Sequence, residues 1–243
     1  MIILSLYKEE EKDIERLLRY ISYQFPDITS IMYVINPKGN DTINDLTAIL
    51  YKGRNYITEE AGSLKFKIGP KSFYQPNAEL TYTLYKIILN FSGLKGKEVV
   101  CDLYTGIGPI ANFIATHCQK VIGIEAIPEA VEDAKENSKI KNIKNTEFIT
   151  GDVIDILTDE FVINKGNPDV VIVGPPRSGM HGNVIKTLLS IKPEKIVYVS
   201  CNTSTQARDI NLLSHKYQVR KIQPVDMFPH THHIENIILL EIV

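Results

Sequence analysis

The sequence contains no tryptophan, few cysteines and no surplus of basic side chains. Its three scattered cysteines do not make a disulfide framework, so we expect the protein in the reducing cytoplasm. No apolar run approaches the roughly 18 residues of a membrane span, and the N-terminus lacks the pattern of a signal peptide. With 27 basic against 29 acidic side chains the net charge is −2, which argues against binding nucleic acid through bulk charge.

The 243 residues, 44% of them apolar, are enough for one or two globular domains with a substantial core. Residues 1–75 combine one amphipathic helix, Glu9–Gln24, with short apolar segments, a pattern that predicts a small α+β unit. The strands expected in this unit are Ile2–Leu6, Ile31–Ile35, Leu50–Tyr51 and Leu64–Ile68. We expect a domain boundary after residue 75 and a second domain over residues 76–243.

Apolar strands alternate with helices in the second domain. The strands are expected at Glu98–Leu103, Val121–Glu125, Thr146–Thr150, Val170–Val173 and Lys195–Ser200, and the helices at Ala78–Asn90, Pro109–Thr116, Pro128–Lys139, 183–190 and 203–214. This alternation predicts a parallel sheet covered on both faces. Two last strands, Tyr217–Val225 and Ile234–Val243, have only a loop between them and should pair antiparallel. The predicted α/β fold, a Rossmann-like sheet with a C-terminal hairpin, has the layout of class I S-adenosylmethionine (SAM) methyltransferases.

Three successive strand ends carry residues suited to a nucleoside cofactor. The first βα turn runs from Asp102 through Gly106 and Gly108, whose glycines allow a close approach of ligand to backbone. Glu125 ends the second strand and suits ribose hydroxyls, and Asp152 follows the third strand, where it suits an adenine amino group. Taken singly, the glycines are also typical of a generic tight turn, and each acid of a strand-end cap. SAM fits better than NAD or a nucleotide phosphate, because a third glycine and a basic residue at the loop are both missing.

Four further segments decide the reaction class. They are Phe73-Tyr74-Gln75-Pro76-Asn77, Gly174-Pro175-Pro176-Arg177-Ser178-Gly179, Ser200-Cys201-Asn202 with Thr205, and Asp226-Met227-Phe228-Pro229 continuing to Glu235. Here the sequence resembles the RNA uracil-C5 methyltransferases, which make 5-methyluridine in large-subunit rRNA and in the tRNA T-loop. The resemblance covers about three quarters of the chain, from Leu64 to the C-terminus.

The chemistry of this family requires a thiol and a base. C5 of uracil is a poor nucleophile until a thiolate adds to C6, and a base must later remove the C5 proton. By the resemblance, Cys201 is the nucleophile and Glu235 the base. Cys101 and Cys118 are expected to be buried core residues, the usual fate of cysteine.

The resemblance also implies the roles of other residues. The residues expected at the cofactor are Gln75, Asp102, Tyr104, Gly106, Gly108, Glu125 and Asp152, and those on the substrate side are Gly174 and Arg177. For Arg177 an ion pair that holds its loop and a contact to RNA phosphate remain equally open. The histidines His230, His232 and His233 form a weak ligand set, so no metal is expected; by the resemblance they orient the loop that presents Glu235.

The sequence departs from the family pattern at two positions of its motifs. The family has Asp where this chain has Gly174, a residue that neither hydrogen-bonds the uracil nor supports the chemistry, so turnover is in doubt. Thr203 replaces the usual Pro after Ser-Cys-Asn, and we expect it to cap the following helix. The alternatives are a SAM-fold protein that binds RNA without turnover and, less favoured, a cysteine–histidine hydrolase that uses Cys201.

The N-terminal part departs further. Family members generally begin with a small β-barrel RNA-binding domain, and many carry a four-cysteine iron–sulfur cluster; neither pattern is present here. We therefore expect a bacterial 23S rRNA type that starts within the family's central domain, either as a fragment or as a minimal member. We expect a monomer that binds RNA, with rRNA favoured over tRNA. No membrane contact is expected. RNA binding is expected to rest either on an N-terminal domain that this sequence lacks or on local cations such as Lys65, Lys67, Lys71 and Arg177.

Overall fold

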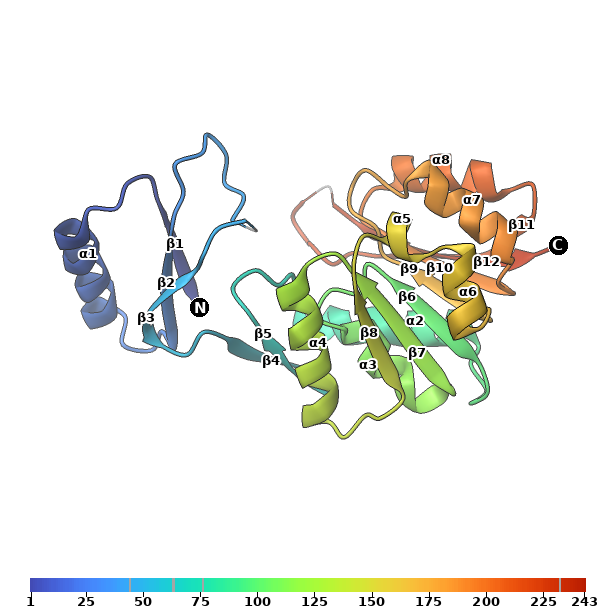
Figure 1. Ribbon diagram of the computed structural model, residues 1–243, viewed down its shortest axis with the longest axis horizontal. Helices are drawn as coiled ribbons and strands as arrows, with labels where there is room; N and C mark the ends of the chain where they lie inside the picture. The colour runs from blue at the N-terminus through green and yellow to red at the C-terminus, as the bar shows by residue number, and fades with distance from the viewer. Residues whose placement is uncertain (44, 63, 76, 232) are drawn as a thin grey trace.

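The computed structural model describes residues 1–43, 45–62, 64–75, 77–231 and 233–243. A small N-terminal unit stands at one end of the molecule (Figure 1) and contains the elements β1 (Ile2–Leu6), α1 (Glu11–Gln24), β2 (Ser30–Ile35) and β3 (Ile49–Gly53). In its sheet β2 pairs parallel with β1 and antiparallel with β3. Ile14 and Leu18 of α1 pack on Ile31, because the apolar stripe of an amphipathic helix is buried against a sheet.

The hairpin of β4 (Ile57–Ala61) and β5 (Leu64–Ile68) lies between this unit and the rest of the chain (Figure 1). Phe66 and Ile68 belong to the core of the C-terminal part. The sequence did not predict β4, because its polar segment Thr58-Glu59-Glu60 carries no apolar alternation. The domain boundary after residue 75 stays a prediction, and Pro76 beside it lies outside the described residues.

The central sheet has seven strands, in the order β11-β12-β10-β9-β6-β7-β8. The strands are β6 (Val99–Leu103), β7 (Lys120–Glu125), β8 (Thr146–Thr150), β9 (Val170–Val173), β10 (Lys195–Ser200), β11 (Tyr217–Val225) and β12 (Glu235–Ile242). β6 to β10 run parallel, whereas β12 is antiparallel to both β10 and β11. The predicted C-terminal hairpin is thus confirmed, and all five parallel strands end at the same edge of the sheet.

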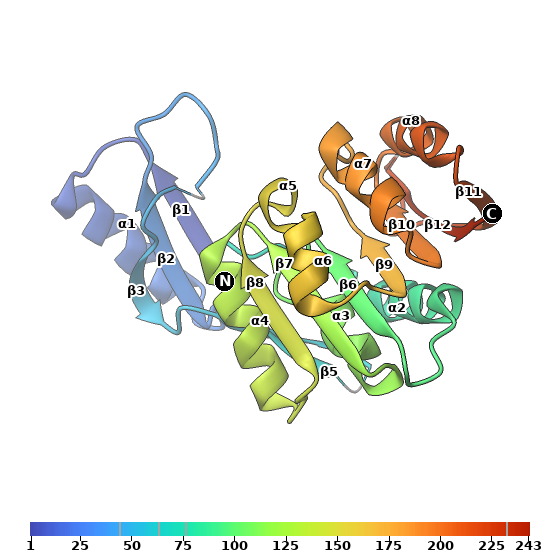
Figure 2. The same ribbon diagram turned by 45° about the vertical axis from the view of Figure 1, so that its right-hand side comes forward.

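Helices cover both faces of the sheet (Figure 1). On one side, here called the α2 face, lie α2 (Ala78–Ser92), α3 (Pro109–Ile114) and α4 (Pro128–Ile140). On the other, the α8 face, lie α5 (Val153–Ile156), α6 (Asp159–Lys165), α7 (Gly182–Ile191) and α8 (Thr203–Leu213). α7 and α8 lie side by side (Figures 1 and 2). The short α5 and α6 were not predicted, because helices of 4 and 7 residues contain too few turns for a periodic pattern.

Side chains of each strand alternate between these two faces. Val197 and Val199 of β10 enter the core under the α2 face, whereas Ile196 and Tyr198 enter the core under the α8 face. This period of two fixes the face on which each residue at the carboxyl edge lies. In the described part of the chain, no helix has the length and apolarity that crossing a membrane requires.

Candidate active site

Strand register brings Cys201 and Glu235 together. β10 pairs antiparallel with β12, with Ser200 opposite Asn236, so the next pair toward the carboxyl edge is Cys201 with Glu235. Residues opposite each other in an antiparallel pair have Cα atoms about 4.5–5.5 Å apart and side chains on the same face. Because Val199 and Ile237 lie in the core under the α2 face, the alternation directs Cys201 and Glu235 to that face as well.

Glu235 is a buried carboxylate, with 6% of its surface exposed. Burial raises its pKa above the ordinary value, while a hydrogen bond from the side chain of Gln75 and the nearby charge of Arg177 lower it. Gln75 comes from the segment before α2 and Arg177 from the loop after β9, so three distant parts of the chain meet here. A carboxylate whose pKa is raised by burial is a better proton acceptor near neutral pH.

Cys201 differs in exposure from the other two cysteines. It is half-buried, whereas Cys101 is 0% and Cys118 8% exposed. The Cys118 thiol donates a hydrogen bond to the carbonyl of Ile114, 3.5 Å away, and burial raises the pKa of this thiol to about 11. Burial also raises the pKa of Cys101 far above the ordinary value. Cys101 and Cys118 are thus core residues, and Cys201 is the thiol that a substrate can reach.

The helix that follows Cys201 begins differently from the expectation. Asn202, not Thr203, is the N-cap of α8, and its side-chain oxygen accepts hydrogen bonds from the amides of Ser204 and Thr205. The expectation that Thr203 caps the helix is therefore wrong. Thr203 is the first helical residue, a position where proline is common because its amide has no helical partner.

The glycine loop after β6 is held by Glu125 at the end of β7. The two carboxylate oxygens of Glu125 accept hydrogen bonds from the amides of Gly106 and Ile127, each at 3.0 Å. Gly106 has a positive φ of +57° and open space where a Cβ would be, which leaves room for a ligand. Gly108 has a different reason to be glycine: its φ is +71° and a Cβ would meet Phe148 at 2.9 Å.

Asp102 is a buried carboxyl group beneath the glycine loop, 2% exposed. Its pKa is raised to about 7: burial and, to a lesser extent, the neighbouring Glu125 raise it, whereas hydrogen bonds from the Thr105 hydroxyl, at 2.6 Å, and from the backbone of Ala111 lower it. Few interactions compensate its charge, so a ligand with a positive charge would be stabilised here.

Among the buried polar atoms without a hydrogen-bond partner in the described residues are the Tyr74 and Tyr85 hydroxyls and Oε1 of Gln75. Tyr85 lies near both Asp102 and Tyr74, whose proximity adds to the effect of burial in raising its pKa. Buried polar groups are normally paired, so these atoms point to a polar ligand. SAM, with an ammonium, a carboxylate and ribose hydroxyls, fits this set of groups.

Two of the residues expected at the cofactor lie on the other side of the loop. Tyr104 and Asp152 line a cavity of about 520 Å³ together with Pro176 and Ser178 of the loop after β9 and with residues of α7 and α8. Tyr104 has a φ of +63°, an unfavourable backbone conformation that turns its side chain toward the core under the α8 face. Asp152 is exposed and caps α5 by accepting a hydrogen bond from the amide of Ile154. Both thus lie toward the α8 face, and their contact with the cofactor stays a prediction.

The loop after β9 places Gly174 and Arg177. The amide of Gly174 donates to the Leu103 carbonyl at 3.3 Å, and a Cβ at Gly174 would meet no atom within 4 Å. Arg177 is exposed, and its Nη2 lies 3.4 Å from Nε2 of His233. The ion pairs between described residues do not include Arg177, so of its two expected roles the ion pair that holds the loop is not supported.

The histidines on the loop before β12 occupy different surroundings. The His233 ring packs edge-on against Phe228, with centroids 6.4 Å apart. His230 is exposed and has a φ of +74°, and His232 lies outside the described residues. His233 thus lies between Phe228 and Arg177, two residues from Glu235.

The lysines expected to hold RNA are paired within the chain. Lys65 contacts Glu60, Lys67 contacts Glu136 and Lys71 contacts Glu129. These ion pairs offset the local positive charge, and the part of the three lysines in RNA binding stays a prediction. Arg177 is the member of the expected set that lies at the site.

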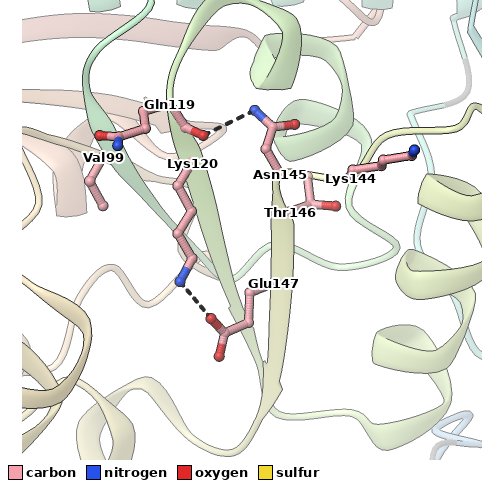
Figure 3. A pocket seen from close by; sticks show the side chains of 7 residues that line it. All are labelled: Val99, Gln119, Lys120, Lys144, Asn145, Thr146 and Glu147. Atoms are coloured by element: carbon pink, nitrogen blue, oxygen red, sulfur yellow. Dashed lines mark hydrogen bonds and ion pairs between the residues drawn. The ribbon is translucent and has the colours of Figure 1, made fainter.

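A second hollow, of about 500 Å³, lies at the opposite edge of the sheet, where β6, β7 and β8 begin (Figure 3). It is lined by Val99, Gln119, Lys120, Lys144, Asn145, Thr146 and Glu147. Lys120 and Glu147 form an ion pair across it at 2.8 Å (Figure 3). None of the expected site residues lines this hollow.

Sequence reasoning missed the polar residues that lock the catalytic strands together. Nε2 of Gln206 in α8 donates to the carbonyls of Tyr198 and Asn236, both at 3.1 Å, and Nδ2 of Asn236 donates back to Gln206 at 2.8 Å. Gln206 therefore ties α8 to β10 and to β12 beside Glu235. Its only sequence signal is its place one helical turn after the cap Asn202.

Fold and site together define the class of SAM-dependent methyltransferases. The structure of Pyrococcus horikoshii TYW2 in complex with MeSAdo has a TM-score of 0.63 at 16% identity, over 99% of this chain and 87% of that one, a likeness of fold alone. The structure of Pyrococcus abyssi tRNA (uracil-54, C5)-methyltransferase in complex with S-adenosyl-L-homocysteine has a TM-score of 0.75 at 30% identity. The match covers 90% of this chain and 52% of the P. abyssi chain.

Residues 53–243 match the tRNA (uracil-5-)-methyltransferase family, and the chain belongs to it. An uncharacterized RNA methyltransferase of Bacteroides thetaiotaomicron is 54% identical over 100% of this chain and 54% of the relative, and one of Porphyromonas gingivalis is 54% identical over 99% and 52%. The chain thus spans about half the length of the curated relatives it matches. The expected fold class and family are confirmed, and SAM is the cofactor of that family.

The burial of Asp102 predicts a change in stability. Its pKa is 3.8 ordinarily and about 7 in the fold, so the folded state binds more protons between these values, and the free energy of unfolding falls as the pH rises through this range. Asp102→Asn removes the cost of the buried charge. We expect it to stabilise the ligand-free protein by about 3 kcal/mol at pH 8 and by little at pH 4, in urea unfolding.

Asp155→Asn, on the exposed side of α5, is the matched control, because it removes an acid that is not buried. Equal free energies of unfolding of Asp102→Asn and the parent at pH 8 would show that burial of the Asp102 carboxylate does not destabilise the folded protein. Asp102→Asn should also weaken SAM binding, since it removes the charge that is expected to face the ligand.

Proposed function

We propose that this protein methylates C5 of a uridine in RNA through a covalent adduct between Cys201 and C6 of the base. The register that pairs Ser200 with Asn236, one position before Cys201 and Glu235, is the observation that carries this proposal, because the reaction needs a nucleophile and a base at one carbon–carbon bond. Membership of the tRNA (uracil-5-)-methyltransferase family supports it. Since the chain spans about half of its curated relatives, the activity of the whole protein is part of the proposal.

In the first step the Cys201 thiolate adds to C6 of uracil, a sulfur–carbon bond forms, and the electron pair of the C5–C6 double bond moves into an enolate. C5 is now the nucleophile for an electrophilic methyl group, which SAM would supply with S-adenosyl-L-homocysteine as the leaving group. Glu235 then accepts the C5 proton, the C5–C6 double bond forms again, and the sulfur–C6 bond breaks to release the thiolate. The raised pKa of Glu235, caused by its burial, favours this proton transfer.

Asp102, Gln75, Glu125 and Gly106 would hold SAM, which when bound supplies an electrophilic methyl group. Asp102 offers a buried negative charge, and Gln75 has an unpaired buried oxygen. Glu125 already orients the glycine loop through two backbone amides. Gln75 also donates to Glu235, so one side chain would link the cofactor to the base.

As substrate we propose rRNA in preference to tRNA, because the C-terminal third of the sequence resembles the rRNA branch. The P. abyssi neighbour is named as a tRNA (uracil-54, C5)-methyltransferase, which supports tRNA as the second candidate. An impaired enzyme that binds RNA without turnover is the other alternative, and it follows from Gly174.

Transfer of the labelled methyl group of SAM to RNA tests the proposal. Unmodified 23S rRNA and tRNA transcripts serve as substrates, and the nucleosides are identified after digestion. We expect 5-methyluridine in rRNA and none in transcripts already methylated at C5. A methyl group found on another atom or another base would contradict the proposed reaction, and label in tRNA alone would contradict only the proposed substrate.

A further inference from the structure

One side of α8 makes a row of contacts to the loop that carries Arg177. Nδ2 of Asn202, the cap of α8, donates to the Arg177 carbonyl at 2.9 Å, and the Thr205 hydroxyl donates to the same carbonyl at 3.2 Å. Asn202 and Thr205 are three residues apart and so lie on one side of the helix. The loop backbone is therefore anchored at Arg177 while the guanidinium stays exposed.

The next turn of α8 continues the row with a charged pair. Nη2 of Arg208 donates to the Ser178 carbonyl at 2.9 Å and is within 3.4 Å of the Met180 carbonyl. Nε and Nη2 of Arg208 also bind one oxygen of Asp209, at 2.9 and 2.7 Å. Arg208 thus joins the loop to its own neighbour in the helix.

Asp209 is fully buried, with 0% exposed. Its second oxygen accepts a hydrogen bond from the Met180 amide at 2.7 Å and one from the Tyr198 hydroxyl of β10, also at 2.7 Å. A buried carboxylate is costly unless several donors satisfy it. Here the donors come from the loop, from the catalytic strand β10 and from α8, so the cost is offset only while all three are assembled.

Gly179 shows how closely the loop fits this pair. Its φ is +79°, and a Cβ there would lie 2.6 Å from Nη2 of Arg208 and 2.6 Å from Oδ2 of Asp209. Only glycine permits this approach of the loop backbone to α8. The contact is therefore specific to the position of the loop.

We propose that Arg208 and Asp209 are positioning residues that hold the Arg177 loop on α8, the helix that begins immediately after Cys201. The role of Arg177 toward substrate rests on the proposed function. The loop and the nucleophile then move as one body, and Arg177 stays beside His233 and Glu235. Arg177 is thus presented as a fixed cation to the phosphate of the target nucleotide.

Asp209→Asn is the selective test. Its amide oxygen can still accept from Met180 and Tyr198, but its NH₂ group faces the guanidinium of Arg208 and breaks that contact. We expect hydrogen exchange of the amides at 177–181 to accelerate about tenfold, measured by mass spectrometry on the full chain. The KM for uridine-containing RNA should rise about tenfold with unchanged SAM affinity.

Arg220→Ala is the matched control, because it removes an arginine from a distant ion pair with Glu241 and leaves every donor to Asp209 in place. It should leave loop exchange and the KM for RNA unchanged. In an Arg177→Ala background, Asp209→Asn should have no further effect on the KM, because the residues act through one group.

Loop exchange that stays at the parent rate in Asp209→Asn would overturn the proposal. So would exchange that rises equally in Arg220→Ala, or an RNA KM that stays the same while the loop opens. If the parent chain transfers no methyl group to any RNA, the proposed function fails, and faster loop exchange in Asp209→Asn alone still supports the positioning role.

Discussion

Cys201→Ala is expected to abolish the covalent complex between this protein and RNA that contains 5-fluorouridine. Fluorine replaces the C5 hydrogen, so after methyl transfer Glu235 has no proton to accept and the bond from Cys201 to C6 persists. Without the thiol no such bond forms, and turnover on ordinary RNA should fall at least about 10³-fold, below detection. The complex is measured by gel mobility after denaturation, in the presence of SAM.

Cys118→Ala is the control for this experiment. Cys118 is buried and hydrogen-bonded to the backbone of α3, so its loss should cost some stability and leave the covalent complex intact. A complex that survives Cys201→Ala would overturn the assignment of the nucleophile. A complex lost equally in Cys118→Ala would show that the proteins failed to fold, which a circular dichroism spectrum checks.

Glu235→Gln should separate the two steps that Cys201 and Glu235 serve. The adduct still forms, because addition to C6 needs only the thiolate, but the C5 proton is not removed. Ordinary uridine RNA should then accumulate in a methylated covalent complex, as 5-fluorouridine RNA does with the parent. The hydrogen bond from Gln75 also reaches this position, so the neutral amide is accommodated.

Gly174→Asp is expected to raise methyl transfer about 100-fold, the effect typical of a correctly placed group that assists acid–base or electrostatic catalysis. The structure has room for the change: a Cβ at Gly174 meets no atom within 4 Å, and its φ is not positive. Gly174 follows Val173 at the carboxyl end of β9, between the strands that carry Asp102 and Cys201. The alternation of side chains directs an aspartate there to the α2 face, where the base and the cofactor residues lie.

Gly39→Asp adds the same charge at another glycine with open space, in an exposed turn of the N-terminal unit. It should leave methyl transfer unchanged. If Gly174→Asp raises the rate from zero, the present chain is the impaired form of an enzyme; if the parent is already fast and the aspartate changes nothing, glycine suffices at this position. A rate lowered by Gly174→Asp would contradict the proposed place of this residue beside the target base.

Local sequence patterns predicted the architecture of the second domain. The strands Thr146–Thr150, Val170–Val173, Lys195–Ser200 and Tyr217–Val225 begin and end at the residues expected, because a buried strand has to be a continuous apolar run between turns. The failures have local causes as well. β4 carries mostly polar residues at the edge of a two-stranded hairpin, and α5 is a single helical turn.

The motifs identified the family and its candidate residues but not how these residues meet. Glu235 and Gln75 are far apart in the sequence, and their hydrogen bond depends on the packing of the segment before α2 against β12. Tyr104 and Asp152 were expected together with Asp102, yet the backbone conformation of Tyr104 turns it to the opposite face. Spacing along a chain carries no information on such turns.

The sequence by itself determined the α/β class, the alternation of strands and helices along the second domain and the two core cysteines, since each depends on residue type and local period, and it proposed Cys201 and Glu235 for the reaction. The near-neutral composition was a poor guide to the partner, because a few placed charges matter more than the total. Only the tertiary structure decided that Lys65, Lys67 and Lys71 are already paired, that Asp102 is buried at a raised pKa, and that Asp209 joins the Arg177 loop to β10. Pairing and burial depend on residues that are distant in the sequence, and these residues come into contact only when the chain folds into its sheet and helices.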